Sequence, residues 1–362
     1  MNPPVRRLQV VDSHTCGQPT RVIITGASLP PGADPGAARE ELRTQRDWVR
    51  RVAVMEPRGH RSMFAAALIP PVTSRGDFGV VYMDSYGYPN MCGHATIGVV
   101  TTLFEEGFIP GLAAGHPADV DLALLTPAGR VELRAHLAGE HVESVAFRIP
   151  MAYYLGPVDI RVRDVDKTAE LAYGGQWYAF IDVAGLGIGV ERESVDELVR
   201  MSVAARAEIE RNIDLSDPMT GTPPHPVNVV WVDSPRRPDA DARNVAISPA
   251  GSFDRSPCGT ATCARMAALM ARGQLAVGDP FINEGLMGTV YRGRAVAEAT
   301  RRGITGIVAE VAGSAWVTGR SELTVDPRDP LGDGYLVGGG PAIGGAALDN
   351  VIRPTVGARR TP

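Results

Sequence analysis

A chain of 362 residues with 44% hydrophobic and 21% charged side chains is typical of a globular protein and long enough for two domains. Its net charge of −5 offers no basic surface for a nucleic acid or a membrane. No segment reaches the roughly 18 apolar residues of a membrane helix, and residues 1–11 lack the apolar core of a secretion signal, so we expect a cytoplasmic protein.

The first half of the chain is predicted to combine strands with two helices. Residues 37–54 are rich in helix formers and carry apolar Leu42, Trp48 and Val52, which indicates one surface helix. A second helix is expected to begin at Cys92. The predicted strands, one or two in the first range and one in each of the others, cover residues 5–24, 64–69, 78–83, 120–125, 130–137 and 142–149.

The second half repeats this plan. Residues 195–213 predict a helix, because apolar side chains recur at helical spacing from Leu198 to Ile209. Another helix is expected to begin at Cys258. The predicted strands cover residues 158–163, 177–183, 227–232, 244–247, 289–297, 307–311 and 314–317. Both halves are therefore of the α/β (α+β) class.

We place the boundary between the halves between residues 149 and 165, where the plan of strands and helices starts again. The predicted units are an N-terminal half of residues 1–157, a C-terminal half of residues 158–322, a return segment of residues 323–336 packing on the N-terminal half, and a glycine-rich tail of residues 337–362.

One short pattern occurs once in each half. It reads Cys92-Gly93-His94-Ala95-Thr96 in the first copy and Cys258-Gly259-Thr260-Ala261-Thr262 in the second. A mostly apolar stretch follows each copy and ends at a glycine 15 residues after the cysteine, Gly107 or Gly273. Each copy therefore predicts a cysteine at the start of a helix that stops at a glycine.

Two such cysteines suggest a specific chemistry. A thiol has a pKa of about 8.5, which a helix N-terminus can lower to roughly 3.5–7.5, so we expect a thiolate near neutral pH. The free N–H groups of the helix ends form an anion site that suits a carboxylate. If Cys92 and Cys258 flank the adjacent Cα, one removes a proton and the other delivers one to the opposite face.

Other interpretations of the cysteines are less consistent with the spacing. Cys16 and Cys263 are expected to be inert buried thiols. A zinc site could use Cys92 with His94, or Cys258 with Cys263, but neither spacing matches a structural zinc motif. A nucleophilic pair of Cys92 with His14 or His60 would suit a hydrolase or a transferase, yet it leaves Cys258 unused.

The sequence predicts no cofactor and no metal. Lys167 is the only lysine, and it lies in a polar stretch where a pyridoxal phosphate Schiff base is not expected. A P-loop and a Gly-x-Gly-x-x-Gly motif are both missing, since Arg192 stands where the third glycine after Gly187 and Gly189 would be.

Three polar segments allow two roles each. Asp254 could bind a substrate ammonium or cap the helix that follows Cys258. Residues 56–60 (Glu-Pro-Arg-Gly-His) indicate a turn with an internal ion pair, and residues 12–15 (Asp-Ser-His-Thr) could line a cleft or only end a strand.

The chain resembles the proline racemase family in several motifs in the family's order, from about residue 10 to 336. The two cysteine motifs carry most of this resemblance, as Met91-Cys92-Gly93-His94 and as Asp254-Arg255-Ser256-Pro257-Cys258-Gly259-Thr260. Further matching segments are residues 12–15, residues 56–60 with Met63-Phe64, Tyr173-Gly174-Gly175, and residues 326–331.

The resemblance implies a diaminopimelate-epimerase-like fold: two pseudo-symmetric halves, each with a β-sheet wrapped around a central helix, and a site between them. It implies a cofactor-independent isomerase, usually a homodimer, with a thiol/thiolate pair that acts on a small imino acid. By motif, Cys92 and Cys258 would be the acid/base pair. The substrate-binding residues implied by the motifs are Gly93, His94, Gly259 and Thr260 for the carboxylate, and Asp254 with His94 for the ring nitrogen.

The family includes proline racemases, 4-hydroxyproline 2-epimerases and trans-3-hydroxyproline dehydratases. Dehydratases typically have threonine at the position of Cys258, so a cysteine there favours racemisation or epimerisation. Of three residues expected around the ring, Phe64 resembles proline racemases, whereas Ser248 and Asn228 are polar, as in hydroxyproline epimerases. We therefore expect a 4-hydroxyproline 2-epimerase, with a proline racemase and then a trans-3-hydroxy-L-proline dehydratase as alternatives.

The sequence departs from the family near its N-terminus. Cys16-Gly17-Gln18 stands where relatives more often have Gly or Glu, then Gly, then Glu. Gln18 therefore removes a charge close to the expected cleft.

Overall fold

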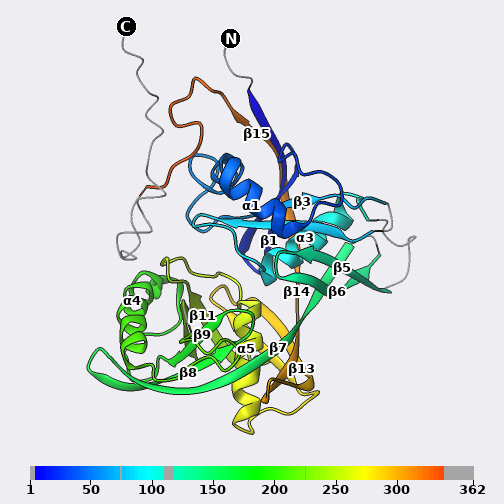
Figure 1. Ribbon diagram of the computed structural model, residues 1–362. Coiled ribbons are helices and arrows are strands. Elements are labelled where there is room, and N and C mark those ends of the chain that lie inside the picture. The colour runs from blue at the N-terminus through cyan, green and yellow to red at the C-terminus, as the bar shows by residue number, and fades with distance from the viewer. Residues whose placement is uncertain (1–4, 74–75, 110–117, 140, 225, 338–362) are drawn as a thin grey trace.

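The computed structural model describes residues 5–73, 76–109, 118–139, 141–224 and 226–337. They form two halves, each with a sheet curved around one central helix (Figure 1). All strands of the described residues belong to one sheet of 15 strands, and the two halves are its two curved parts.

The N-terminal half surrounds α3 (Gly93–Glu105), which is buried at every position from Gly93 to Phe104. A helix without a polar face needs apolar cover on all sides, and this explains why the sheet curves around it. Two further helices, α1 (Pro35–Gln45) and α2 (Trp48–Val54), pack on the outer face of this sheet. The strands of this half are β1 (Arg6–Thr15), β2 (Gln18–Thr25), β3 (Phe64–Ile69), β4 (Phe78–Asp84), β5 (Ala118–Thr126) and β6 (Gly129–Ala138).

The C-terminal half surrounds α5 (Gly259–Ala271) in the same way, and α4 (Val195–Asn212) covers the outside of its sheet. The helix starts at Cys92 and Cys258 are as predicted, and both stops at Gly107 and Gly273 have a φ near +70°. The strands of this half are β8 (Val165–Tyr173), β9 (Trp177–Asp182), β10 (Val227–Asp233), β11 (Ala242–Ile247), β12 (Pro280–Gly285) and β13 (Val290–Arg301).

Two strands, β7 (His141–Val162) and β14 (Ile304–Gly313), connect the halves, and a third leads back along the N-terminal half. Strand β7 pairs with β6 at its start and with β8 at its end, so it runs from one half into the other (Figure 1). Strand β14 pairs with the middle of β7, and β15 (Ala315–Val325) pairs with β1 along its length. The boundary at residue 157 stays a prediction, and it falls inside the continuous strand β7.

The return to the N-terminal half starts before the predicted residue 323. Pairing of β15 with β1 begins at Ala315, because a strand of 11 residues is needed to cover all of β1. Leu323, Val325 and Leu336 then pack against the cluster under α1 and α2. Of the predicted tail, residues 338–362 lie outside the described residues.

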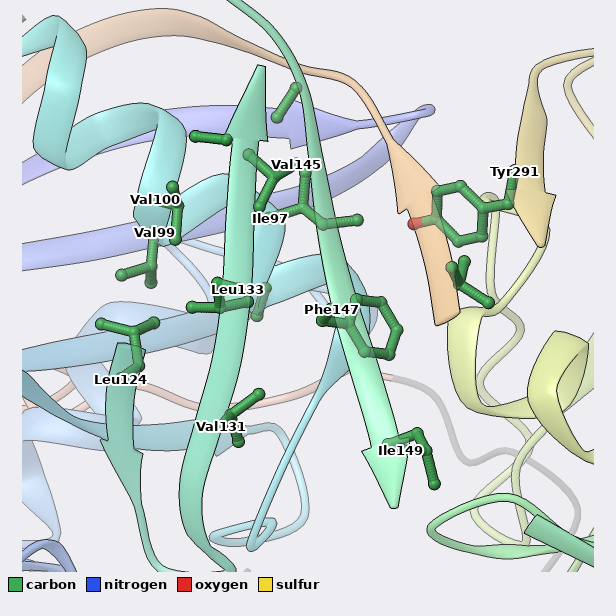
Figure 2. Packing of buried hydrophobic residues seen from close by; sticks show 14 of the residues in the cluster. Ile97, Val99, Val100, Leu124, Val131, Leu133, Val145, Phe147, Ile149 and Tyr291 are labelled. Atoms are coloured by element: carbon green, nitrogen blue, oxygen red, sulfur yellow. The ribbon is translucent and has the colours of Figure 1, made fainter. Parts of the chain in front are cut away.

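One hydrophobic core reaches both central helices. It includes Ile97 of α3 and Met266 of α5, with Phe147 of β7 among the residues that join them. Figure 2 shows part of this core, to which β5, β6 and β7 contribute Leu124, Leu133 and Phe147.

The single helix expected at residues 37–54 is wrong. The chain forms α1 and α2 instead and bends at Arg46, whose φ of −138° is not helical. The bend lets apolar side chains of both short helices, such as Leu42 and Val49, reach the sheet. Two strands were not predicted: β8 begins in the polar stretch around Lys167, and β12 is only six residues long and starts at a proline.

Candidate active site

All ten of the predicted site residues line one pocket between the two halves. They come from β3, β10, the segment after β11, and the starts of α3 and α5. The pocket has a volume of about 160 Å³, which suits a small molecule. The ten residues are Phe64, Cys92, Gly93, His94, Asn228, Ser248, Asp254, Cys258, Gly259 and Thr260.

The two helix starts are built alike. Cys92 and Cys258 are the residues immediately before α3 and α5. The hydroxyl of Thr96 donates to the carbonyl oxygen of Cys92 at 2.7 Å, and that of Thr262 donates to the carbonyl oxygen of Cys258 at 2.8 Å. Each cysteine therefore stands at the positive end of a buried helix.

The backbone at the two cysteines differs. Cys92 is extended, whereas Cys258 has a φ of +63°, a left-handed conformation that L residues other than glycine rarely adopt. The segment before Cys258 is fixed by amide groups: Asn244 and Asn283 both donate to the carbonyl oxygen of Pro257 at 3.2 Å. These contacts hold the Cys258 side chain in one direction.

A single aromatic ring separates the two helix ends. A Cβ on Gly93 would lie 2.7 Å from Cζ of Phe147, and a Cβ on Gly259 would lie 2.6 Å from the same atom. Both distances are shorter than any normal carbon contact. The glycine after each cysteine is thus required by Phe147, which packs against both helix starts.

Polar side chains surround each thiol. The sulfur of Cys92 lies 3.2 Å from Nδ1 of His94, and the sulfur of Cys258 lies 3.6 Å from the hydroxyl of Tyr178. The Tyr178 hydroxyl also lies 2.5 Å from Oγ1 of Thr260. The imidazole of His94 meets the ring of Phe64 edge-on, with 4.9 Å between ring centroids.

Burial changes the ionisation expected for these groups. It raises the pKa of Cys92 well above its usual range and that of Cys258 to about 12, with Asp254 adding to the effect. The backbone N–H groups of Ala95 and Ala261 act in the opposite direction but do not outweigh burial. Burial also lowers the pKa of His94. Burial therefore acts against the thiolate that the two helix starts favour, and a thiolate near neutral pH stays a prediction.

The Asp254 side chain lines the pocket and does not cap the first turn of α5. Its carboxylate accepts from the backbone N–H of Ser256 at 2.8 Å, which leaves the helix start at Gly259 without an Asp254 cap. Of the two roles considered for Asp254, the geometry leaves it available to a cation in the pocket.

The other polar segments support the site from outside. Asp12 forms an ion pair with Arg21 at 2.7 Å, and the Thr15 hydroxyl donates to the carbonyl oxygen of His94 at 2.8 Å. The prediction of an internal ion pair in residues 56–60 is wrong. The guanidinium of Arg58 instead donates to carbonyl oxygens of the return segment, such as that of Gly332 at 3.0 Å.

Cys16 and Cys263 lie outside this pocket. Both thiols are free and buried, and burial raises the pKa of each. In the part of the chain that the structure describes, no group of three or more His, Cys, Asp or Glu side chains could hold a metal ion. No helix within the described ranges is both long and apolar enough to cross a membrane.

The pocket also contains residues that the sequence did not indicate. Tyr178 carries no motif, whereas Gln176 directly follows the matching segment Tyr173-Gly174-Gly175 and could have been found from it. The additional lining residues are Gln18, Arg61, Ser62, Met63, Asp84, Tyr86, Gln176, Tyr178, Ala246, Ser252 and Phe253.

Contacts between the halves close the sides of the pocket. The Gln18 side chain donates to the carbonyl oxygen of Ser62 at 3.1 Å and accepts from the backbone N–H of Arg255 at 2.9 Å. The Tyr86 hydroxyl donates to the carbonyl oxygen of Ala250 at 2.9 Å. Because Ser62 and Tyr86 belong to the first half, and Ala250 and Arg255 to the second, both contacts join the halves.

Two curved parts of one sheet, each around a buried helix and with a pocket between the helix starts, define a diaminopimelate-epimerase-like fold, as the sequence predicted. A solved hydroxyproline epimerase from Agrobacterium vitis, with bound trans-4-hydroxy-L-proline, has this arrangement. It superposes with a TM-score of 0.79 at 27% identity, over 96% of this chain and 98% of that one.

The proline racemase family model matches residues 10–336, and the chain belongs to this family. A proline racemase from Clostridioides difficile is 32% identical over 92% of this chain and 98% of its own. A 4-hydroxyproline 2-epimerase from Paracoccus denitrificans is 35% identical over 90% of this chain and 97% of its own. The predicted family is confirmed, and the chain is an enzyme of the racemase and epimerase class of isomerases.

Proposed function

We propose that this enzyme inverts Cα of a free proline-type imino acid without a cofactor, by acid/base catalysis between Cys92 and Cys258. The proposed reaction is that of a 4-hydroxyproline 2-epimerase, which converts trans-4-hydroxy-L-proline to cis-4-hydroxy-D-proline. One observation carries the proposal: two thiols, each at the start of its own central helix, line the same small pocket.

In the proposed mechanism the substrate carboxylate binds backbone N–H groups at the two helix starts, those of Gly93 and His94 and those of Gly259 and Thr260. Asp254, together with His94, faces the cationic ring nitrogen. The negative charge of Asp254 raises the pKa of both thiols. The cationic ring nitrogen of the substrate offsets this charge and so lowers the pKa of the thiols. One thiolate then removes the α-proton, and the thiol on the opposite face returns one.

The raised pKa of each thiol is consistent with this task. A thiolate whose conjugate acid has a high pKa is a stronger base than an ordinary thiolate, and an α-proton of an amino acid is weakly acidic. The neutral partner thiol meanwhile stays protonated and can act as the acid.

The pocket walls support a hydroxylated ring as substrate. Asn228 and Ser248 offer polar groups, and Phe64 an apolar face. A proline racemase is the second candidate, because a relative of that name is 32% identical along nearly its whole length. The third candidate is a dehydratase that acts on trans-3-hydroxy-L-proline, and the experiment below distinguishes it from the other two.

The deciding experiment incubates purified enzyme in D₂O with the stereoisomers of proline, 4-hydroxyproline and 3-hydroxyproline, without added metal or pyridoxal phosphate. We expect α-deuterium incorporation and a change of optical rotation toward that of the equilibrium mixture of the two Cα configurations, fastest with 4-hydroxyproline. A cyclic imine trapped by a carbonyl reagent would instead indicate loss of water. Absence of both exchange and imine would contradict the proposal.

Single replacements test the roles of the two thiols. Cys92→Ala and Cys258→Ala should each lower inversion by at least about a hundredfold, because general acid or base catalysis contributes roughly 10²–10⁴-fold. Cys263→Ala is the matched control, since this thiol is buried in the same helix as the Cys258 start but outside the pocket. Wild-type inversion in either pocket variant would refute the two-thiol mechanism.

The cytoplasmic location and the homodimer remain predictions. Sedimentation of the purified enzyme over a range of concentrations would test the dimer.

A further inference from the structure

Asn228 is held in one orientation on the polar wall of the pocket. Its side-chain nitrogen donates to the backbone carbonyl oxygen of Trp177 at 3.0 Å and to Oε1 of Gln176 at 3.1 Å. A backbone carbonyl can only accept, so the amide nitrogen must face Trp177. Both hydrogens of the Asn228 amide are thereby used.

The remaining polar atom of Asn228 is an acceptor. Asn228 is 9% exposed and lines the pocket, and Oδ1 has no partner among the residues that the structure describes. Oδ1 is therefore available to accept from a donor on a molecule that binds in the pocket.

Gln176 presents the complementary atom. Because its Oε1 accepts from Asn228, the other end of its amide is an NH₂ group, with no partner among the described residues. Gln176 lines the same pocket, immediately before strand β9. The two linked amides therefore offer one acceptor and one donor to the same pocket.

We propose that Gln176 is a specificity-determining residue that recognises a hydroxyl group on the substrate ring. It fixes the Asn228 amide so that Oδ1 accepts from the hydroxyl, and its own NH₂ donates to the same hydroxyl oxygen. This inference rests on the proposed function, because it assumes that the ring of an imino acid fills the pocket.

A hydroxyl group matches this pair because it both donates and accepts. An unsubstituted ring would leave Oδ1 of Asn228 without a donor, and an unpaired buried acceptor is unfavourable. The pair should therefore favour hydroxylated rings over proline by about tenfold or more in kcat/KM.

Two replacements of Gln176 separate its two contacts. Gln176→Glu keeps an oxygen that accepts from Asn228 but cannot donate to the substrate, whereas Gln176→Leu removes both contacts. We expect kcat/KM for 4-hydroxyproline to fall about tenfold in Gln176→Glu and further in Gln176→Leu, mainly through KM. For proline, kcat/KM should fall by a smaller factor, because proline has no ring hydroxyl to lose contacts with Asn228 and Gln176.

Gln274→Glu is the matched control, because Gln274 is exposed just after α5 and outside the pocket, and the replacement adds the same charge. Equal losses on proline and 4-hydroxyproline, or no loss in either Gln176 variant, would overturn the inference.

Binding of both imino acids by calorimetry keeps this test separate from the proposed chemistry. If the wild type binds but never inverts them, the acid/base mechanism fails, and the ratio of the two dissociation constants in wild type and Gln176→Leu still decides the role of Gln176. If the wild type inverts both rings and Gln176→Leu leaves their ratio unchanged, only the role of Gln176 falls.

Discussion

At the scale of single residues, the ionisation of Cys92 and Cys258 depends on burial more than on the helix ends. Because burial raises the pKa of each thiol, we expect the thiolate fraction to be small at pH 7 and to grow with pH. We expect the rate of alkylation by iodoacetamide, and kcat/KM for inversion, to rise steadily from pH 7 to pH 9. A plateau below pH 7 would show that the helix ends dominate.

Asp254 provides a second residue-scale prediction. Its charge raises the pKa of both thiols, so Asp254→Asn should move the alkylation profile of Cys258 to lower pH, even as substrate binding weakens. The measurement is alkylation against pH, read by mass spectrometry of the Cys258 peptide. Asp164→Asn is the control, since Asp164 is exposed in a hairpin with a φ of +62° that asparagine tolerates. An unshifted profile would mean that Asp254 does not act on the thiol.

The site residues and their ionisation were not equally predictable. The repeated motif and the resemblance indicated ten residues that all line the pocket, because short contiguous segments at two helix starts carry most of them. The direction of the thiol pKa could not be predicted, since it depends on how much water the two halves exclude together. Tyr178 could not be found either, because its role depends on which strand passes behind Cys258.

At the scale of elements, Phe147 sets the spacing between the starts of α3 and α5. Gly259→Ala would place a Cβ 2.6 Å from the Phe147 ring and push one helix start away from the other. A shift of about 1 Å can lower catalysis about a hundredfold. We therefore expect kcat to fall by one to two orders of magnitude, with a smaller change in melting temperature, measured by steady-state kinetics and thermal unfolding.

A second replacement identifies the cause. Phe147→Leu in the Gly259→Ala background makes room for the new methyl group and should restore part of kcat. Gly319→Ala, on β15 with open space around the position, is the control and should retain wild-type kinetics. Loss of activity that Phe147→Leu does not relieve would argue against a spacing role.

Most helices and strands could be predicted from local sequence patterns, and those that could not share one physical reason. The helices after Cys92 and Cys258, and strands such as β3, are contiguous, mostly apolar runs with clear ends. Such runs can be predicted from the local sequence. The break between α1 and α2 at Arg46 and the short strand β12 cannot be predicted in this way, because each depends on the surface against which the segment packs. Strand β7 could not be seen as one element, since its continuity comes from pairing with β14, more than 140 residues away.

At the scale of the whole molecule, contacts between the two halves flank the pocket. The continuous strand β7 joins the halves on one side, and the contacts of Gln18 and Tyr86 join them beside the pocket. We expect these contacts to limit how far the halves separate, and therefore how often the pocket opens wide to a substrate.

Tyr86→Phe removes the hydroxyl that donates to Ala250 and leaves the ring in place. One hydrogen bond contributes about 1 kcal/mol, so the open form should become about fivefold more populated. Alkylation of Cys258 in the absence of substrate should accelerate by that factor, because this residue is otherwise buried. Tyr88→Phe is the matched control: its hydroxyl donates to Asp47 at 2.9 Å, within the same half. Equal alkylation rates in Tyr86→Phe and Tyr88→Phe would mean that the Tyr86 contact does not govern opening, whereas a further increase on adding Gln18→Leu would show that both contacts resist the same motion.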